Sequence, residues 1–390
     1  MNVPKLRFKE FKDEWQSINL ATVFQYFATN SFSRDQLSES GILKNLHYGD
    51  IHRKYNSIVN ENDEITSYVK DINYNNKYEL LKNNDLIFAD ASEDYEGIGK
   101  AVEVVNVNDK TISGLHTILA RDNLNVFAPM FKGYYFNSSI VHNQLRVLAN
   151  GFKVYGISKD SINKLNIKVP STNEQSKIAN TLYLLDKKIE LQSKKIEDLK
   201  LFKKGLILSL KKNSFNWHTV CIKDLFKITR GVVIPKNELS EFKSGEYKYP
   251  VYSSQTSNQG VLGYSDTFDF NGKYLTWTTD GANAGKVFYR NGKFRCTNVC
   301  GVLYEDNIRF TNELFAELLN YETPKHVSYV GNPKLMNNIM ANIKIKIPSD
   351  DIQENISLVI NTINHKVNLE NKKLLKLQEL KKGLMQSMFV

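Results

Sequence analysis

Three short stretches of the chain carry residues that could do catalytic or metal-binding chemistry. The stretch GANAGKV at 281–287 resembles a phosphate-binding loop, but three residues separate its glycines instead of four, and valine follows the lysine where a hydroxyl should hold magnesium. Cys296 and Cys300 have no second Cys or His pair at zinc spacing, and His47 and His52 have no carboxylate arranged with them on one helix face. We therefore expect a tight turn at 281–287 and no metal site.

Signatures of nucleases and methyltransferases are incomplete in this chain. Glu241 and Lys243 supply one half of a nuclease signature, but no Pro-Asp pair precedes them. Asn332 and Pro333 are followed by Lys334, whereas a methyltransferase loop continues with a second proline and an aromatic residue, and the Gly-rich turn for S-adenosylmethionine is missing. The sequence therefore predicts a chain without catalysis of its own.

The composition is that of a chain with several folded domains. Its 390 residues are 41% hydrophobic and 24% charged, which suits roughly two or three domains that each bury a core. No run approaches the roughly 18 to 20 apolar residues of a membrane span, and the opening segment MNVPKLRFKEFKDEW is charged where a signal peptide would be apolar. Three cysteines are a sparse and odd set that argues against a disulfide framework. We expect a cytoplasmic protein.

Two distant segments of the chain repeat one another. The tetrapeptide KKGL stands at 203–206 and again at 381–384, 178 positions later. The same shift aligns 167–212 with 345–390 without a gap, and identical residues recur along the whole alignment. Chance similarity between lysine-rich helices would not hold one register for so long. An internal duplication is therefore indicated.

Both segments are predicted to be long helices. In each, a proline ends a strand-like stretch, and a capping box follows, formed by Thr172 with Gln175 and by Asp350 with Gln353. About 38 residues at 1.5 Å each make a rod of roughly 57 Å, which is too long to lie across one small domain. A helix that packs on its own globular core is the alternative, but this length favours two helices that pair with each other.

A heptad pattern predicts the face through which the helices pair. Apolar residues recur at steps of three and four over about five heptads in each segment, as in a coiled coil. Polar residues interrupt the pattern at equivalent places, namely Gln192 and Lys203 in the first segment and Glu370 and Lys381 in the second. The apolar positions of this seam are Ile178, Leu182, Leu185, Ile189, Ile196, Leu199, Leu206 and Leu210 in the first segment, and Ile356, Ile360, Ile363, Val367, Leu374, Leu377, Leu384 and Met388 in the second.

The order of the segments predicts the architecture. Globular regions and helices alternate, at 1–166, 167–212, 213–344 and 345–390. Antiparallel pairing of the helices would relate the two halves by an approximate two-fold axis, whereas parallel pairing would not. The globular regions are loosely related, each with a β-rich hairpin, a Gly-rich turn and a returning strand. The expected fold class is α/β (α+β), with two mixed α/β domains and two long helices that pair as an antiparallel coiled coil.

The chain resembles a known family, the DNA-specificity subunits of type I restriction-modification systems. The resemblance covers the whole length, from the opening VPKLRFKEFKDEWQ, through SFSR and LHYGDIH in a first target-recognition domain, to the ending LKKGLMQSMFV. Its most specific motif is P-x-x-x-EQ-x-KIA-x-x-L-x-x-LD-x-x-I at 170–189. The second copy departs from this motif with Ile352 in place of Glu174 and Asn364 in place of Asp186. These changes weaken the motif there without touching the seam.

The resemblance implies a DNA-recognition subunit that does no catalysis. Each target-recognition domain would read one half of a bipartite DNA sequence, and the helices would set the spacing and dock two methylation subunits. Restriction subunits with translocase and nuclease activity would then join. The resemblance places S-adenosylmethionine on the methylation subunits and ATP and Mg²⁺ on partner subunits, with no cofactor in this chain.

Positive charge is concentrated on the helical segments. Of the ten excess positive charges, five lie within 174–212 and three within 352–390. These lysines are either solvated coiled-coil surface or face phosphates or acidic partner surfaces. Because neutralised phosphates supply most non-specific affinity, we predict that the isolated chain binds DNA weakly and that partners supply the missing positive surface. Titration of labelled duplexes checks this, and nanomolar specific binding by the isolated chain in about 150 mM salt would contradict it.

Polar loop residues supply candidate DNA contacts in each globular region. Arginine can bind guanine through two hydrogen bonds, and other polar side chains can reach base edges or phosphates. Gly49 would let the backbone approach DNA closely, and any of these residues could instead be a solvated loop residue. The candidates are Ser33, Arg34, His47, Tyr48, Gly49, His52, Arg53 and Lys54 in the first region, and Arg230, Lys236, Ser253, Ser254, Gln255, Asn258, Thr278, Thr279 and Asn283 in the second.

A second interpretation of a different class also fits these patterns. The chain could be a non-catalytic coiled-coil scaffold whose two α/β domains bind proteins or glycans. Adenine methylation of a bipartite sequence that depends on this chain would separate the two interpretations.

Overall fold

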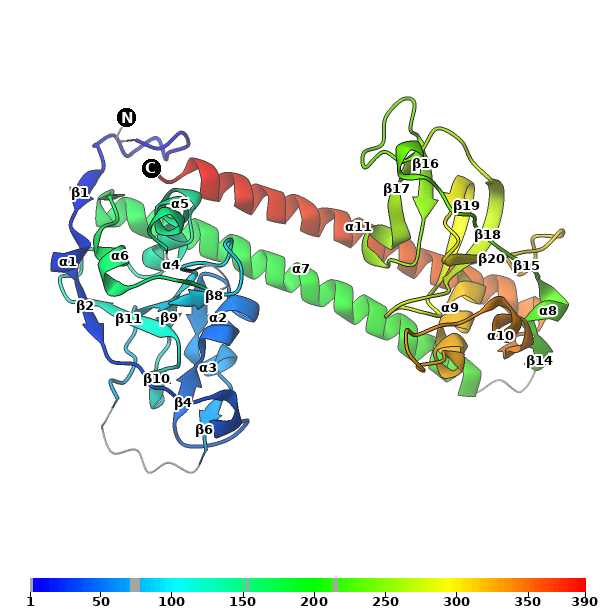
Figure 1. Ribbon diagram of the computed structural model, residues 1–390, viewed down its shortest axis with the longest axis horizontal. Coiled ribbons are helices and arrows are strands. Elements are labelled where there is room, and N and C mark those ends of the chain that lie inside the picture. The colour runs from blue at the N-terminus through cyan, green and yellow to red at the C-terminus, as the bar shows by residue number, and fades with distance from the viewer. Residues whose placement is uncertain (1–2, 71–77, 150, 152–153, 213–216) are drawn as a thin grey trace. The chain divides into compact units, whose positions relative to one another are not determined.

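The computed structural model describes residues 3–70, 78–149, 151, 154–212 and 217–390. The chain divides into two compact units. Unit 1 comprises Met1–Ser193 and Lys373–Val390, and unit 2 comprises Lys194–Lys372. Each unit therefore contains one globular region, which Figure 1 shows as a mixture of strands and helices, together with part of each long helix.

Unit 1 is built on a five-stranded sheet in the order β2-β11-β7-β9-β5. Neighbouring strands are antiparallel except β5 and β9, which are parallel. The run Leu86–Ala89 is apolar throughout because its alternate side chains enter two different cores. The strands are β2 (Phe24–Phe27), β5 (Ile58–Asn60), β7 (Leu86–Ala89), β9 (Ala101–Val105) and β11 (Thr117–Asp122).

Shorter elements complete unit 1. A four-stranded sheet has the order β10-β4-β6-β3, and two-stranded sheets pair β1 with β13 and β8 with β12. The strands are β1 (Gln16–Ile18), β3 (Leu37–Ser38), β4 (Lys44–Leu46), β6 (Tyr68–Val69), β8 (Ala91–Ser92), β10 (Thr111–Ser113), β12 (Tyr155–Gly156) and β13 (Ile167–Val169). The helices are α1 (Leu20–Val23), η1 (Arg34–Gln36), α2 (Tyr48–Arg53), α3 (Glu61–Glu64), α4 (Phe131–Phe136), α5 (Ser139–Leu148) and α6 (Lys159–Asn163).

Unit 2 repeats the strand order of unit 1. Its sheet has the order β15-β20-β18-β19-β16-β17, and again the only parallel pair among these strands joins the fourth and fifth. This shared topology confirms that the two globular regions are related, with β17 as an added strand. The strands are β15 (Lys227–Arg230), β16 (Tyr249–Tyr252), β17 (Val261–Ser265), β18 (Phe270–Thr278), β19 (Val287–Cys296) and β20 (Cys300–Tyr304).

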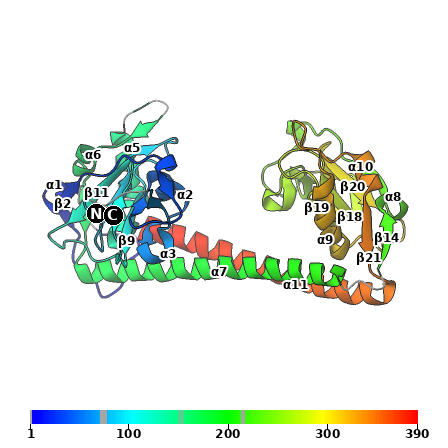
Figure 2. The same ribbon diagram turned by 90° about the horizontal axis from the view of Figure 1, so that it is seen from below.

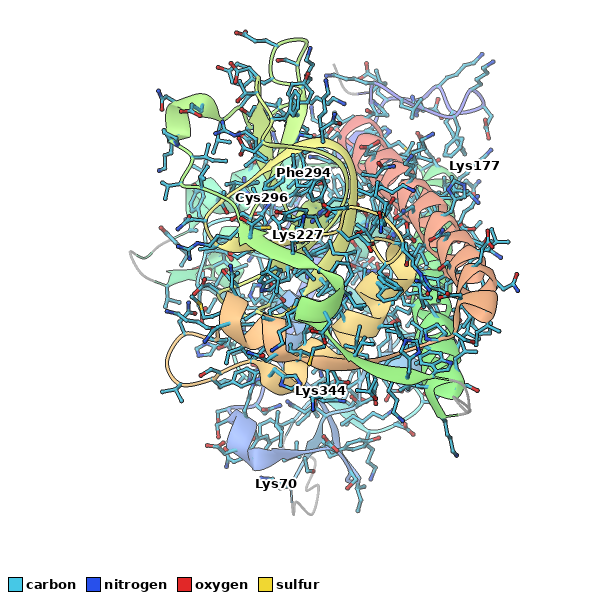
Figure 3. All side chains as sticks on the ribbon, turned by 90° about the vertical axis from the view of Figure 1, so that its right-hand side faces the viewer. Lys70, Lys177, Lys227, Phe294, Cys296 and Lys344 are labelled. Atoms are coloured by element: carbon cyan, nitrogen blue, oxygen red, sulfur yellow. The ribbon has the colours of Figure 1, made fainter. Side chains whose placement is uncertain are left out.

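Helices and a second small sheet cover the main sheet of unit 2. Helix α9 lies against β19 (Figure 2). Phe294 and Cys296, labelled in Figure 3, share a core with Cys300 and Val302, and all three cysteines are free thiols. The remaining elements are β14 (His218–Cys221) paired with β21 (Lys344–Ile347), α8 (Ile222–Leu225), η2 (Lys236–Glu238), η3 (Ser257–Gly260), α9 (Glu313–Glu322), η4 (Thr323–His326) and α10 (Asn337–Asn342).

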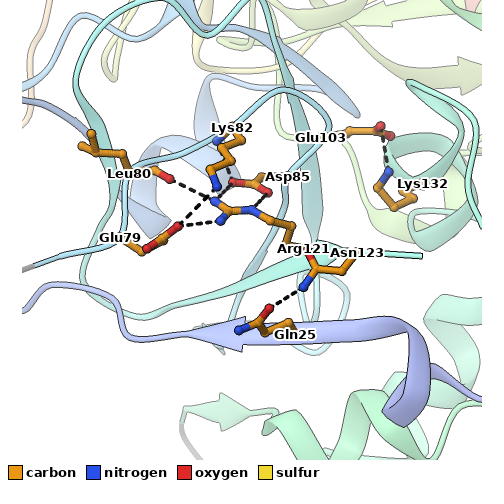
Figure 4. A network of polar contacts seen from close by, with 9 residues as sticks. All are labelled: Gln25, Glu79, Leu80, Lys82, Asp85, Glu103, Arg121, Asn123 and Lys132. Carbon is orange, nitrogen blue, oxygen red and sulfur yellow. Dashed lines mark hydrogen bonds and ion pairs between the residues drawn. The ribbon is translucent and has the colours of Figure 1, made fainter. Parts of the chain in front are cut away.

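Buried charges connect the elements of unit 1 (Figure 4). Arg121 of β11 binds the two carboxylate oxygens of Asp85 at 2.7 and 2.8 Å and Glu79 at 2.5 Å. Lys132 of α4 lies 3.2 Å from Glu103 of β9, and both side chains are at most 1% exposed. The Glu103 carboxylate also accepts hydrogen bonds from two backbone N–H groups, one in α4 and one at its N-cap. One carboxylate therefore anchors α4 to the sheet.

Replacing Lys132 with methionine is expected to lower the free energy of unfolding of unit 1 by about 3–5 kcal/mol, because Glu103 would remain as a buried carboxylate without its cation. Burial already raises the pKa of Glu103. Chemical denaturation of the purified chain measures the loss. The double variant Lys132→Met, Glu103→Gln should recover most of it, and a double variant as unstable as the single one would contradict this explanation.

Two long helices, α7 (Thr172–Lys212) and α11 (Asp350–Ser387), follow β13 and β21. They confirm the predicted long helices, and the two strands occupy the first residues of the repeated segments. None of the helices within the described residues is both long and apolar enough to cross a bilayer.

The predicted capping boxes are wrong, because the serine before each helix is its N-cap residue. The Ser171 hydroxyl accepts from the Glu174 N–H at 3.4 Å, and its carbonyl accepts from the Gln175 N–H at 2.9 Å. The side chain of Gln175 instead accepts from the Ala128 N–H at 2.8 Å. The Gln175 side chain, which the local pattern assigns to the helix cap, thus binds a tertiary partner instead.

The second helix also begins one residue after a serine, but the Ser349 hydroxyl has no hydrogen-bond partner among the described residues. The Ser349 carbonyl accepts from the Gln353 N–H at 3.1 Å. Asp350, the predicted cap, is the first helical residue and forms an ion pair with Arg309. The Asp350 carboxylate therefore pairs with a side chain and does not cap the helix. The sequence pattern places the cap one residue too late.

Within each unit the two long helices run antiparallel. In unit 2, Lys195 of α7 binds Glu370 of α11 at 2.8 Å, while Lys203, further along α7, binds Asn364, which comes earlier in α11. In unit 1, residues of both helices, such as Ile178 of α7 and Leu384 of α11, pack in one core. Every predicted seam position is buried or half-buried.

Polar residues that interrupt the seam make matching contacts in the two units. In unit 1, Lys381 pairs with Asp186 at 2.5 Å. The equivalent residues in unit 2 are Lys203 and Asn364, which lie 2.7 Å apart, and Lys203 also pairs with Glu317 of α9 at 2.5 Å. The duplication therefore extends to this interaction, with a carboxylate from α9 taking the place of the one that the second helix lacks.

Candidate nucleic-acid interface

In unit 1, the ends of three strands converge on the turn Ser113–His116 that precedes β11. The backbone N–H groups of Asn30, which follows β2, and of Asp90, which follows β7, each donate to a carbonyl of this turn at 3.1 Å. The turn donates in return to the carbonyl of Leu46, at the end of β4, at 2.8 Å. Side chains from well-separated parts of the sequence are therefore held at one edge of the unit.

A cavity of about 520 Å³ lies at this edge. Helix α2 and the segment after β8 form its walls, and the Tyr48 ring in its lining contacts the His116 ring, with centroids 5.3 Å apart. Six of the candidates predicted for the first region line the cavity, whereas Ser33 and Lys54 do not. The lining residues are Arg34, His47, Tyr48, Gly49, His52, Arg53, Ser92, Glu93, Asp94, Glu96, Gly97 and Lys100.

His47 fixes the start of helix α2 as its N-cap residue. Its Nδ1 atom accepts a hydrogen bond from the Gly49 N–H at 3.1 Å, so Nδ1 carries no proton. Burial, together with the positive charge of Arg34, lowers the pKa of His47 and keeps the ring neutral. At the other end of α2, His52 Nε2 lies 2.9 Å from the carbonyl of Ala91 and ties the helix to β8.

Because folding lowers the pKa of His47, this residue stabilises unit 1 above about pH 6.5, and the contribution is lost as the pH falls through the lowered value. Thermal denaturation of the chain and of His47→Asn at about pH 7.5 and about pH 5.5 tests this, since asparagine caps a helix without titrating. The wild-type chain should lose more stability on acidification than the variant. Equal losses would show that His47 does not titrate in this way.

Two residues of α2 place Arg34 at the cavity. The buried carboxylate of Asp50 lies 3.4 Å from the Arg34 guanidinium and 3.3 Å from the Lys54 ammonium, while 57% of the Arg34 side chain is exposed. A Cβ atom at Gly49 would lie 2.7 Å from Arg34 Nη2. The glycine thus makes room for the arginine, a reason that the sequence alone did not suggest.

Unit 2 has a turn in the equivalent place, Thr297–Val299 before β20. The N–H of Val232, after β15, donates to the carbonyl of Cys296 at 3.1 Å, and the N–H of Thr279, after β18, donates to the turn at 3.1 Å. The turn donates to the carbonyl of Tyr252, at the end of β16, at 2.9 Å. Since β15, β18 and β20 correspond to β2, β7 and β11, the ends of two equivalent strands meet the turn in both units. The third strand end belongs to β4 in unit 1 and to β16, the counterpart of β5, in unit 2.

The candidates predicted for the second region fall into two groups. The Ser253 hydroxyl, at the end of β16, lies 3.1 Å from the Thr297 hydroxyl of the turn. Candidates that reach the surface are Arg230, Lys236, Asn258 and Asn283, which are exposed, and Ser253, Ser254 and Gln255, which are half-buried.

Thr278 and Thr279 form the second group, because their side chains are buried. The Thr278 hydroxyl donates to the carbonyl of Asn283, and the Thr279 hydroxyl donates to Asp280 at 2.7 Å. The Thr278 hydroxyl, which also accepts from the Lys286 N–H at 3.1 Å, closes the turn between β18 and β19, and this confirms the predicted tight turn at 281–287. Neither threonine is part of the candidate surface, since both side chains are buried and both hydroxyls are engaged in these bonds.

Several residues at these edges were not among the predicted contacts. In unit 1, the turn before β11 places His116 next to Asp90. His116 Nδ1 lies 3.3 Å from a carboxylate oxygen of Asp90. Asn298 is exposed at the tip of the corresponding turn in unit 2. Only the pairing of strands reveals these positions, and no local sequence signal marks them.

The chemistry available at both edges is hydrogen bonding, charge and ring stacking. No group of three or more His, Cys, Asp or Glu side chains that could hold a metal occurs in the part of the chain that the structure describes. In unit 1 the arginines Arg34 and Arg53 offer paired donors, Glu93 and Asp94 offer acceptors, and Tyr48 offers a ring face. Such a set suits the edges of nucleic-acid bases, which present donors and acceptors in fixed patterns.

Comparison with known proteins identifies relatives over most of the chain. A family model described as "Type I restriction modification DNA specificity domain" matches residues 12–201 and 215–379. A Mycoplasma pneumoniae protein named as the N-terminus of a putative type I specificity subunit is 44% identical over 145 residues, which are 37% of this chain and 76% of that protein. Another putative type I specificity subunit of that organism is 33% identical over 220 residues, which are 54% of this chain and 80% of that protein.

Solved structures share the fold. The S subunit of a type I restriction-modification system from M. genitalium matches with a TM-score of 0.64 at 15% identity, over 100% of this chain and 99% of that one. A chain from a type I system whose complex assembly and conformational transition were described matches with a TM-score of 0.52 at 15% identity, over 95% and 96%.

Proposed function

Because this chain belongs to the family of type I restriction modification DNA specificity domains, we propose that unit 1 and unit 2 each read one half of a bipartite DNA site. The chain is a specificity subunit and contributes recognition, while the chemistry is done by partner subunits. The paired helices set the spacing between the half-sites.

One observation carries this proposal most directly. The turn before β11 in unit 1 and the turn before β20 in unit 2 stand at the same place in one topology, and each gathers polar side chains from separate strands. The chemistry around the two turns differs, with Arg34, His47 and Tyr48 at the first and Ser253 and Thr297 at the second. Two equivalent edges with different side chains suit two half-sites with different bases.

Exposed apolar residues on the helices support docking of two copies of one partner. In unit 1, Leu191 of α7 and Leu380 of α11 are 68% and 52% exposed. The equivalent residues in unit 2 are Leu369 of α11 and Phe202 of α7, which are 44% and 61% exposed. Large apolar side chains repeated on exposed helix faces are typical of protein interfaces, and the duplication offers an equivalent pair in each unit, with Phe202 in place of Leu380.

We assign these two surfaces to two methylation subunits that hold S-adenosylmethionine. Restriction subunits that use ATP and Mg²⁺ would complete the assembly. We further propose that the chain works in the cytoplasm, together with the DNA that it reads.

Mapping of methylated adenines across the genome, in strains with and without the gene for this chain, tests the proposed function. A bipartite motif that is methylated only when the chain is present is the expected result. Absence of any motif that depends on the chain would contradict DNA recognition and favour a scaffold whose domains bind proteins or glycans.

Co-purification gives an independent test. The chain should bring down a methyltransferase with two copies per chain, and only the assembled complex should methylate a duplex that contains the mapped motif. A chain that methylates DNA without a partner would contradict the assignment of catalysis to the partners.

A further inference from the structure

Arg290 on β19 is a buried cation in unit 2. It is 5% exposed, and its guanidinium lies 3.5 Å from the centroid of the Tyr252 ring and 4.5 Å from that of Phe288. Within the described residues Arg290 takes part in no ion pair. Burial lowers the pKa of Arg290, because removing the guanidinium from water disfavours its charged form.

Stability alone does not explain an arginine at this position. Burying a cation without a carboxylate costs several kcal/mol, and an apolar side chain of similar size is often at least as stable there. Arg295, on the same strand, shows the usual solution, because it pairs with Glu238 at 2.8 Å and Asp269 at 3.2 Å. Arg290 must therefore be explained by what its hydrogen bonds hold in place.

One of those hydrogen bonds reaches the loop at 253–260, and the other reaches β18. Arg290 donates from Nη2 to the carbonyl of Gln259 at 2.8 Å and from Nε to the Thr276 hydroxyl at 3.1 Å. Tyr252, on which the guanidinium stacks, immediately precedes the loop. One side chain thus contacts both ends of this loop.

The loop itself has a backbone that needs such support. Asn258 and Gln259 have left-handed φ angles of 47° and 53°. Non-glycine residues seldom adopt this conformation, and two in succession persist only where the surroundings hold them. The loop also contacts the long helix of its own unit, because Gln259 Nε2 lies 3.4 Å from Asn368 Oδ1.

Polar side chains make up the outward face of the loop. Ser257, Asn258 and Gln259 are exposed, and Ser253 at its start contacts Thr297 in the turn that precedes β20. The loop therefore adjoins the edge at which the strand ends of unit 2 meet. Its amide and hydroxyl groups are suited to base edges, and its conformation decides which bases they can reach.

We propose that the loop at 253–260 reads bases of the half-site assigned to unit 2, and that Arg290 is the positioning residue that sets its conformation from the buried side. This proposal rests on the proposed function of unit 2 and deepens it. It predicts that a change at a residue that never touches DNA alters the sequence that is recognised.

The test compares methylation motifs directed by complexes with the wild-type chain and with Arg290→Met. The variant keeps the apolar volume but removes the bond to the Gln259 carbonyl. Discrimination at one or more positions of one half-site should fall by about tenfold or more, the effect of losing a base contact, while the other half-site and the spacer stay unchanged. Arg290→Lys, which keeps a donor but not the planar stack, should restore part of the discrimination.

Arg295→Lys is the matched control, since Arg295 lies on the same strand and does not contact the loop; its motif should equal that of the wild type. Thermal denaturation of each complex separates relaxed reading from unfolding. If Arg290→Met does not give a folded complex, Tyr252→Leu and Arg290→Lys decide the question.

Unchanged motifs in all folded variants of Arg290 and Tyr252 would overturn the proposal. That result differs from failure of the proposed function, in which even the wild-type chain directs no methylation.

Discussion

Replacing Leu191 with glutamate should leave a complex that carries one methylation subunit instead of two, and adding Leu369→Glu should leave a complex with none. The two leucines occupy equivalent positions of the duplicated helices and are both exposed in the chain by itself. If a partner covers each of them, a carboxylate at that position is buried without a counter-charge on association. Such a change costs about 3–5 kcal/mol, roughly a hundredfold to a thousandfold or more in affinity.

The duplication also provides a matched control for this experiment. Leu375 is another exposed leucine of α11, but the equivalent residue of α7 is Glu197. Leu375→Glu therefore introduces a residue that the first copy already has, and it should leave two partners bound. The masses of the purified complexes, measured by light scattering or mass photometry, give the stoichiometry directly. Two bound subunits in the double variant would show that these leucines are not the docking surface.

Inserting four residues into α7 between Lys194 and Leu201 should change the spacer between the half-sites by about one or two base pairs. Four helical residues add about 6 Å and rotate the remainder of the helix by about 40°, and each base pair of DNA spans about 3.4 Å. An insertion also shifts the heptad phase and locally changes how the helices wind about each other. Methylation at the original spacing after the insertion would mean that the helices do not set the distance.

The control for the ruler experiment is an insertion of the same four residues at Gly245. This glycine lies in an exposed segment with nothing within 4 Å of a Cβ atom placed on it. The chain is lengthened equally, but neither helix changes. The spacer and both half-sites should remain those of the wild type, and genome-wide mapping of methylated adenines reads all three in one measurement.

The long helices could be predicted from sequence because periodicity depends only on local spacing. Every apolar seam position is covered, as the steps of three and four imply. The ends of the helices could not be predicted as well. Gln175 has the right spacing for a capping box, yet its side chain binds the backbone of Ala128, far away in the sequence. Local patterns cannot foresee such a tertiary partner.

The candidate site was predictable in unit 1 to the extent that its residues are neighbours in sequence. His47, Tyr48, His52 and Arg53 meet at one cavity because they belong to one short helix and the residue before it. In unit 2 the site is assembled from the ends of several strands. Its turn, Thr297–Val299, cannot be predicted from the sequence, because only the pairing of strands in the structure identifies it. The sequence suggests Thr278 and Thr279 as DNA contacts because they are polar, but polar residues beside a tight turn commonly form hydrogen bonds within the turn itself.

The lysine that interrupts each helix seam has a consequence for how such genes can recombine. Lys381 pairs with Asp186, which lies on the other long helix. Lys203 instead donates to the side-chain amide of Asn364 and pairs with Glu317 of the neighbouring α/β region. Recombination could replace the α/β region of unit 2 with one that has no acidic residue at the place of Glu317. The half-buried ammonium group of Lys203 would then have no carboxylate partner. Exchange between relatives should therefore succeed more often when the incoming region carries that carboxylate, or when aspartate replaces Asn364.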